Sequence, residues 1–124
     1  MRSFNLSDKG VYSQTNNWKA ADWIHVENPS SDDVEDLMTI FGFPKDYIMD
    51  SLDEYEVPRQ EKVKNGAGDD INLLIVLFPK MRSVQEKYTE YHTYPLSIIT
   101  INGTLITVCK ETPSFLTRIM KNES

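Results

Sequence analysis

The sequence predicts a single α/β (α+β) domain in which helices flank a mixed β-sheet in an αβα layer arrangement. Segments with a two-residue apolar period alternate along the chain with a segment of clear 3.6-residue period. The 124 residues are 40% hydrophobic and 26% charged, which is typical of a globular protein. This length suits one domain over residues 1–124, and such a domain buries about two thirds of its unfolded surface without needing disulfides.

The N-terminal part of the chain begins with strands. Residues 2–6 and 11–14 flank the turn-forming triplet Asp8-Lys9-Gly10, which predicts a β-hairpin. A further short strand is expected over residues 23–26. Asn28-Pro29 ends this strand and marks the boundary to the first helix.

The clearest helix is expected over residues 30–41. Ser30 is a good N-cap, and Asp33 three residues later completes a box-like arrangement. Gly42 ends the helix. One apolar stripe along it is formed by Val34, Leu37, Met38 and Phe41.

A second, shorter helix is expected over residues 44–53, beginning at Pro44. Its shared face carries Tyr47, Ile48, Ser51 and Leu52. Both helices are expected to cover the sheet.

The second half of the chain returns to strands. Residues 59–64 alternate weakly, residues 66–70 form a turn, and the apolar run 71–78 indicates a buried strand. The best hairpin signal is Asn102-Gly103 between residues 94–101 and 104–110, because these two residues readily adopt the positive φ angles of a type I′ turn.

A last helix is predicted to start with Thr112 as N-cap and Pro113 at the first helical position. Its amphipathic stripe is cut off after two or three turns, so we expect the chain to be a fragment truncated in its last helix. The residues of this stripe are Phe115, Leu116, Ile119 and Met120.

The net charge of −6 excludes some partners. Phosphate backbones and anionic membrane surfaces attract clustered Lys and Arg, so neither nucleic acid nor direct membrane docking is expected. The longest apolar run, residues 73–78, is far shorter than the roughly 20 residues that cross a bilayer.

Catalytic motifs are also missing from the sequence. The histidines, His25 and His92, have no Cys or His partners at zinc spacing, and Cys109 lies in an apolar strand where a buried, inert thiol is expected. Gly66-Ala67-Gly68 is followed by two aspartates that would repel phosphate, and we interpret it as a turn. The chain is therefore predicted not to be an enzyme and to require no cofactor.

Four carboxylates crowd the end of the second helix: Asp50, Asp53, Glu54 and Glu56. Negative charge there opposes the helix dipole unless a cation or a basic side chain compensates it. Mg²⁺ favours carboxylate and water oxygens and often takes only one or two protein ligands. From these residues alone, a cation site and a solvated acidic face both stay open.

The order of several motifs resembles the cytoplasmic N-terminal domain of the CorA family of Mg²⁺ and Co²⁺ channels. The strand at residues 23–29 is followed by a helix and by Phe41-Gly42-Phe43-Pro44. Further matches are Ile48-Met49-Asp50-Ser51-Leu52-Asp53 and Val57-Pro58-Arg59-Gln60-Glu61. Downstream, residues 71–81 and 95–107 are similar to a strand and a hairpin of the family, so the resemblance spans most of the chain.

The resemblance implies a regulatory domain on the cytoplasmic face of the cell membrane, in a homopentamer whose partners are its own copies and divalent cations. The domain would reach the membrane only through C-terminal segments that carry two transmembrane helices and a Gly-Met-Asn signature. In the family, Mg²⁺ between neighbouring domains holds the pore closed, and the metal-binding Asp of a Glu-Asp pair corresponds to Asp50. Mg²⁺ is thus expected as a weak regulatory ligand.

The chain departs from the family pattern at Met49, which replaces the Glu of that pair and removes one oxygen ligand. The Gly-Met-Asn motif and the pore are absent from these residues. Two alternative hypotheses therefore remain. One is a free-standing α/β binding or adaptor module without a pore, and the other is a metal-assisted hydrolase that uses Asp50, Asp53 and Glu54.

Overall fold

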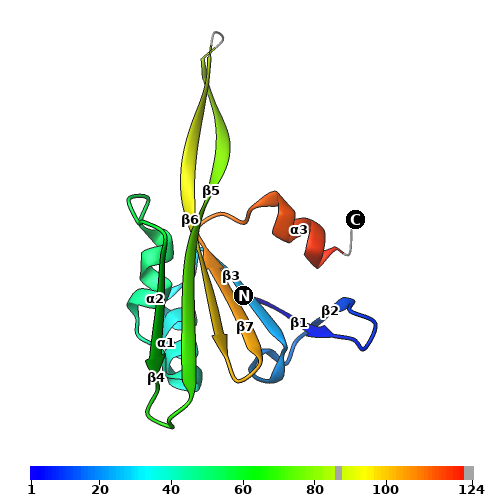
Figure 1. The fold of residues 1–124 in the computed structure, drawn as a ribbon. Helices are drawn as coiled ribbons and strands as arrows, with labels where there is room; N and C mark the ends of the chain where they lie inside the picture. Colours follow the sequence, from blue (N-terminus) through cyan, green and yellow to red (C-terminus); the bar gives the residue numbers. More distant parts are fainter. Residues whose placement is uncertain (86–87, 122–124) are drawn as a thin grey trace.

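A computed structural model describes the backbone of residues 1–85 and 88–121, and their side chains outside 81–91 (Figure 1). The strands are β1 (Arg2–Leu6), β2 (Tyr12–Thr15), β3 (Trp23–Glu27), β4 (Arg59–Lys64), β5 (Asp70–Gln85), β6 (Tyr88–Ile101) and β7 (Thr104–Cys109). The α-helices are α1 (Ser31–Phe41), α2 (Asp46–Met49) and α3 (Ser114–Met120), and short 3₁₀ turns lie at Trp18–Ala20 and Asp50–Leu52. Within the described residues, no helix is long and apolar enough to cross a membrane.

The strands form one mixed sheet in the order β2-β1-β3-β7-β6-β5-β4. All neighbours are antiparallel except β3 and β7, which run parallel from Trp23↔Leu105 to Glu27↔Cys109. This parallel pair joins the N-terminal strands to the C-terminal ones. The mixed sheet that the sequence predicted is therefore confirmed.

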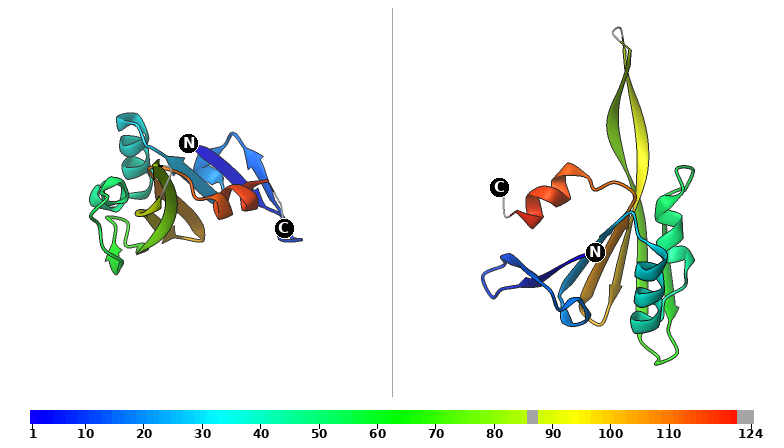
Figure 2. Two further views of the ribbon diagram at one scale, coloured as in Figure 1. Left: turned by 90° about the horizontal axis from the view of Figure 1, so that it is seen from above. Right: turned by 180° about the vertical axis from the view of Figure 1, so that it is seen from behind.

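Helices cover both faces of the sheet, as expected for an αβα layer structure (Figures 1 and 2). One face packs under α1 and α2, with Ile24, Leu37 and Ile48 wholly buried. The other face packs under α3, where Leu116 and Met120 contact a cluster that contains Phe4 and Trp23. Alternation along β3 explains this, because Trp23 and Ile24 point to opposite faces.

The first helix has the ends that the sequence predicted. Ser30 accepts a hydrogen bond from the backbone N–H of Asp33, and the Asp33 carboxylate accepts one from the N–H of Ser30, which completes a capping box. Gly42 adopts a left-handed conformation with φ 75° and ends the helix. The Asn102-Gly103 turn is likewise confirmed, with φ 50° and 78°.

The second helix is shorter than the prediction of 44–53. It begins at Asp46, two residues after Pro44, and its α-helical part ends at Met49, where a 3₁₀ turn continues to Leu52. The apolar face is nevertheless correct, since Tyr47, Ile48 and Ser51 are buried.

The strands β5 and β6 are longer than expected, because the prediction ended the first at residue 78 and began the second at residue 94. Beyond Phe78↔Tyr94 they stay paired as a two-stranded ribbon that projects from the sheet (Figure 1). The apolar run 71–78 is also not buried on both faces. Ile71, Leu73 and Ile75 are buried, whereas Leu74 on the opposite face is 42% exposed.

The start of the last helix differs from the prediction by one position. Pro113 is the N-cap and α3 begins at Ser114, so Thr112 is not the cap. Its hydroxyl instead contacts His25 and Glu27 of β3. The expected apolar stripe is divided, because Leu116 and Met120 are buried while Phe115 and Ile119 are 49% and 43% exposed.

Candidate functional site

Asp50 lies where α2 passes into the 3₁₀ turn Asp50–Leu52. Its neighbours Ile48 and Ser51 are both wholly buried, and the Ser51 hydroxyl donates to the carbonyl of Ile48 at 2.5 Å. These buried residues fix the turn on the sheet. The Asp50 side chain is left 26% exposed, so solvent reaches the carboxylate that the sequence singled out as a metal ligand.

Arg59, the first residue of β4, lies against Asp50 and two further carboxylates. Its Nη2 donates to Oδ2 of Asp50 at 2.5 Å, and its Nη1 donates to Oε1 of Glu56 at 2.7 Å. An oxygen of Glu61 lies 3.0 Å from Nε, without the alignment of a hydrogen bond. Each nitrogen of the guanidinium thus faces a different acidic residue.

The charges of Arg59 and its three acidic partners do not balance. Three carboxylates face one guanidinium, which leaves two negative charges around Arg59. The hydrogen bond with Asp50, followed by the charges of Asp50, Glu56 and Glu61, raises the pKa of Arg59 above its usual value. Burial, and then the Glu61 carboxylate, raises the pKa of the neighbouring Tyr47 phenol. The group therefore favours additional positive charge.

Asp53 and Glu54, the other two carboxylates of the hydrolase hypothesis, do not join Asp50. Asp53 accepts a hydrogen bond from the N–H of Tyr55 at 3.0 Å, and Glu54 lies 3.6 Å from Nζ of Lys110. Among the described residues, no three His, Cys, Asp or Glu side chains are placed to hold a metal ion together. The convergent carboxylates that the hydrolase hypothesis needs are thus not found in the described part of the chain.

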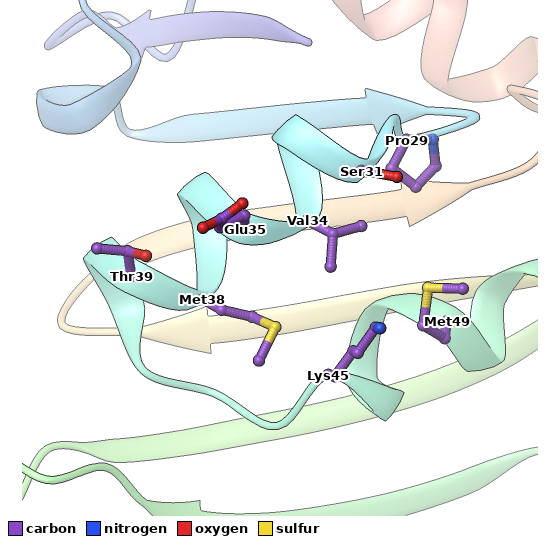
Figure 3. A pocket seen from close by; sticks show the side chains of 8 residues that line it. All are labelled: Pro29, Ser31, Val34, Glu35, Met38, Thr39, Lys45 and Met49. Carbon is purple, nitrogen blue, oxygen red and sulfur yellow. The ribbon is translucent and has the colours of Figure 1, made fainter.

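Met49, in the place of the family's Glu, is 41% exposed and lines an open groove between α1 and α2. The groove has a volume of about 600 Å³ (Figure 3). Val34 and Met38 from α1 and Lys45 from the start of α2 also line it. Ser31, Glu35 and Thr39 supply the side-chain oxygens of the groove, and Glu35 is the one carboxylate among its lining residues, so the groove offers few charged ligands to a cation.

A second polar cluster lies beneath α3, buried at Trp23, His25 and Thr107 and exposed at Glu27. The indole Nε1 of Trp23 donates to Thr107 Oγ1 at 2.9 Å, and this hydroxyl lies 2.6 Å from Nδ1 of His25. On the other side of the imidazole, Nε2 lies 2.8 Å from Thr112 Oγ1, which donates to Glu27. Five side chains thereby link β3, β7 and the segment before α3.

The hydrogen-bond partners of His25 in this cluster determine the tautomer of its ring. Thr112 has one hydroxyl proton, which goes to the Glu27 carboxylate, so its oxygen must accept a proton from Nε2 of His25. In the neutral ring Nδ1 then carries no proton and accepts from the hydroxyl of Thr107. In this series of hydrogen bonds, which runs from Trp23 to Glu27, each donor has one acceptor and the direction of each bond is fixed.

Burial holds His25 and the nearby Cys109 in their uncharged states. It lowers the pKa of His25 from 6.5 to about 4, since the ring is only 2% exposed; Glu27 opposes this shift, and Arg2 and the N-terminal amine assist it. Burial also raises the pKa of the Cys109 thiol to about 11. The buried thiol that the sequence predicted is confirmed, and it is protonated at neutral pH.

Two of these residues were not predicted in their observed roles. Arg59 entered the sequence analysis only as part of a motif, and Thr112 only as a helix cap. The unfavourable charge at the end of α2 was the signal for Arg59, because it required either a cation or a basic side chain. His92 lies in the ribbon, opposite Lys80 in the register of β5 and β6, and away from His25 in the fold.

Comparisons with known proteins agree on one family. The family model described as "CorA-like Mg2+ transporter protein" matches residues 18–124. Among solved structures, the soluble domain of CorA from Methanocaldococcus jannaschii matches with a TM-score of 0.69 and 22% identity, over 98% of this chain and 45% of that chain. The chain thus spans less than half the length of that structure, and at this identity the likeness shows the fold. No curated protein matches the sequence.

Proposed function

Because this chain belongs to the family of CorA-like Mg²⁺ transporter proteins, we propose that it is the cytoplasmic, cation-sensing domain of a divalent metal ion transporter. The observation that carries the sensing role is the position of Asp50. Its carboxylate is partly exposed at the end of α2 and lies in a group with two excess negative charges. A divalent cation at this surface would offset that charge.

The cation site would be completed by a neighbouring copy of the domain. Asp50 supplies one carboxylate, and Mg²⁺ needs further oxygen ligands because it gives up its waters reluctantly. In the proposed homopentamer, these ligands come from the next subunit and from segments outside residues 1–124. The isolated domain should accordingly bind Mg²⁺ only weakly, in the millimolar range or above, which is about 4 kcal/mol at most.

Regulation of the channel would follow from the repulsion between negatively charged neighbouring domains. Assembly brings the acidic surfaces of neighbouring domains together, which is repulsive, and a bridging cation relieves the repulsion. Because the cation binds the closed arrangement better than the open one, it shifts the equilibrium toward closure. Intracellular Mg²⁺ would then limit its own uptake on the cytoplasmic face of the membrane.

The test uses Asp50→Asn and Asp53→Asn in the transporter that carries this domain. Both variants remove one negative charge from the same turn, but the amide oxygen that Asp53→Asn introduces can still accept the hydrogen bond of Tyr55. Protection from protease as Mg²⁺ rises should shift to higher concentration, by about tenfold, in Asp50→Asn only. If the two variants follow the same protection curve, Asp50 is a solvated helix-end carboxylate and the proposal fails.

The groove beside Met49 favours the alternative of a free-standing binding module. The sequence of the native gene beyond Ser124 separates the two functions. A Gly-Met-Asn motif followed by hydrophobic segments supports the transporter, and a stop codon supports the module.

A further inference from the structure

We propose that Arg59 is a built-in competitor of the divalent cation at Asp50 and sets the concentration at which the domain responds. This inference rests on the proposed function, and it concerns how the same site is regulated. Its starting point is that the Asp50 carboxylate already has a cationic partner within its own domain, at 2.5 Å.

The position of Arg59 makes this competition direct. The Oδ2 atom that a metal ion would bind is the atom that accepts the hydrogen bond from Nη2. A dication at Asp50 would also lie beside the positive guanidinium, and like charges at this separation repel. Arg59 therefore has to leave Asp50 before an ion can take its place.

The guanidinium of Arg59 is held in place beside Asp50. Its side chain is only 25% exposed, and Glu56 and Glu61 contact the two nitrogens that do not face Asp50. The backbone of Arg59 is paired with Ile75 in the sheet. Because the arginine is fixed by the fold, it competes at a constant effective concentration, whatever the concentration of the protein.

The same geometry indicates what replaces the guanidinium. The three carboxylates contact three different nitrogens of the guanidinium, and they are not placed to bind one bare ion together. A Mg²⁺ or Mn²⁺ ion that keeps several waters is larger, and its waters can donate to all three carboxylates. Without Arg59, the group would have three negative charges and would favour such an ion more strongly.

The experiment measures Mn²⁺ binding to the 124-residue chain by electron paramagnetic resonance of the free ion. Arg59→Gln is compared with Lys64→Gln, which removes the same charge from the other end of β4, where Lys64 pairs with Asp70. Arg59→Gln should lower the Kd by about tenfold or more relative to the native chain. Lys64→Gln should change it by less than about twofold, because exposed charges at a distance are screened by salt.

Equal effects of the two substitutions would overturn the proposal, since they would show a general response to net charge. The double variant Arg59→Gln, Asp50→Asn should return to the affinity of the native chain. If the double variant keeps the tighter binding, the ion binds elsewhere and the proposal is also wrong.

A second measurement, thermal unfolding, applies if Arg59→Gln destabilises the domain. Mg²⁺ should raise the melting temperature of Arg59→Gln more than that of the native chain, because a ligand stabilises the state that binds it. An equal rise in both would contradict the proposal. These results are independent of channel closure, so failure of Arg59 to compete can be told apart from failure of Asp50 to regulate.

Discussion

At the scale of single residues, the uncharged state of His25 is a structural requirement. The ring accepts one hydrogen bond and donates another, and a second ring proton would place two donors, Nδ1–H and the Thr107 hydroxyl, against each other. Thr107 cannot readily turn its proton away, because its oxygen already accepts from Trp23. Protonation therefore breaks the connection between β3, β7 and Thr112.

This requirement predicts how stability depends on pH. The folded-state pKa of about 4 lies below the unfolded value of 6.5, so the unfolded chain binds the proton more readily between these values. Stability that is fully present above pH 6.5 is lost as the pH falls toward 4. At about 1.4 kcal/mol per pH unit, the loss attributable to His25 is about 3 kcal/mol.

Urea unfolding of the native chain and of His25→Gln at several pH values between 7 and 4 measures this contribution. The carboxylates titrate in both proteins, so the difference between the two isolates the imidazole. The stability cost of His25→Gln should shrink as the pH falls. A cost that is the same at pH 7 and pH 4 would show that His25 does not titrate as inferred.

Residue types and short spacings indicated uncompensated negative charge at the end of the second helix, and the family resemblance singled out Asp50 within it, but neither indicated its partner Arg59. Charge opposed to a helix dipole is visible in sequence, and it indicated that a cation or a basic side chain was needed. Which of these was present could not be predicted, because Arg59 reaches Asp50 only when β4 is placed beside the 3₁₀ turn. Thr112 was misassigned for a similar reason, since its partner His25 is 87 residues away.

At the scale of elements, Gly42 both ends α1 and leaves room for the 65–69 turn. The side-chain amide of Asn65 donates to the carbonyl of Phe41 at 2.9 Å, and its oxygen accepts from the N–H groups of Ala67 and Asp69. A Cβ on Gly42 would lie 3.0 Å from Cβ of Asn65. The end of the helix and the turn are thus locked together.

Gly42→Ala should destabilise the domain by about 2 kcal/mol or more in thermal or urea unfolding. About 1 kcal/mol comes from the left-handed φ of 75°, and the rest from the contact with Asn65. Gly10→Ala is the matched control, because Gly10 has φ 79° and nothing within 4 Å of its added Cβ. Equal losses at both positions would mean that the packing against Asn65 contributes nothing.

Local signals predicted some elements better than others. The helix α1 has a cap, a stop and an apolar stripe, and all three agreed with the structure. The strands continue beyond Phe78, and the sequence there lacks a clear two-residue apolar period, so periodicity did not indicate the ribbon. Its strands are held by pairing with each other, which a single segment of sequence does not reveal.

At the scale of the whole molecule, the number of partners of each strand should determine its protection. Residues 71–75 of β5 pair with both β4 and β6, whereas beyond Phe78 the strand has β6 as its one partner. Amide hydrogen exchange should therefore be slow at residues 71–75 and faster, by roughly 100-fold or more, at residues 80–83. Uniform protection along β5 would contradict the expected independence of the ribbon.

The αβα architecture itself was predicted, but the sheet order was not. The Asn102-Gly103 hairpin and the first hairpin are local, and each was found where its turn residues placed it. The pairing of β3 with β7, by contrast, depends on packing over the whole domain. Motif order supplied what periodicity lacked, because it indicated a family whose fold the structure then matched.

The parallel pairing of β3 with β7 also has a kinetic consequence. The contact of Trp23 with Thr107 joins residues 84 positions apart, whereas the hairpins of the sheet close within a few residues. Closing the longer loop costs more chain entropy before any contact energy is gained. We therefore expect the time needed to fold to be governed by one encounter, between a segment that ends near Glu27 and another that begins near Thr104.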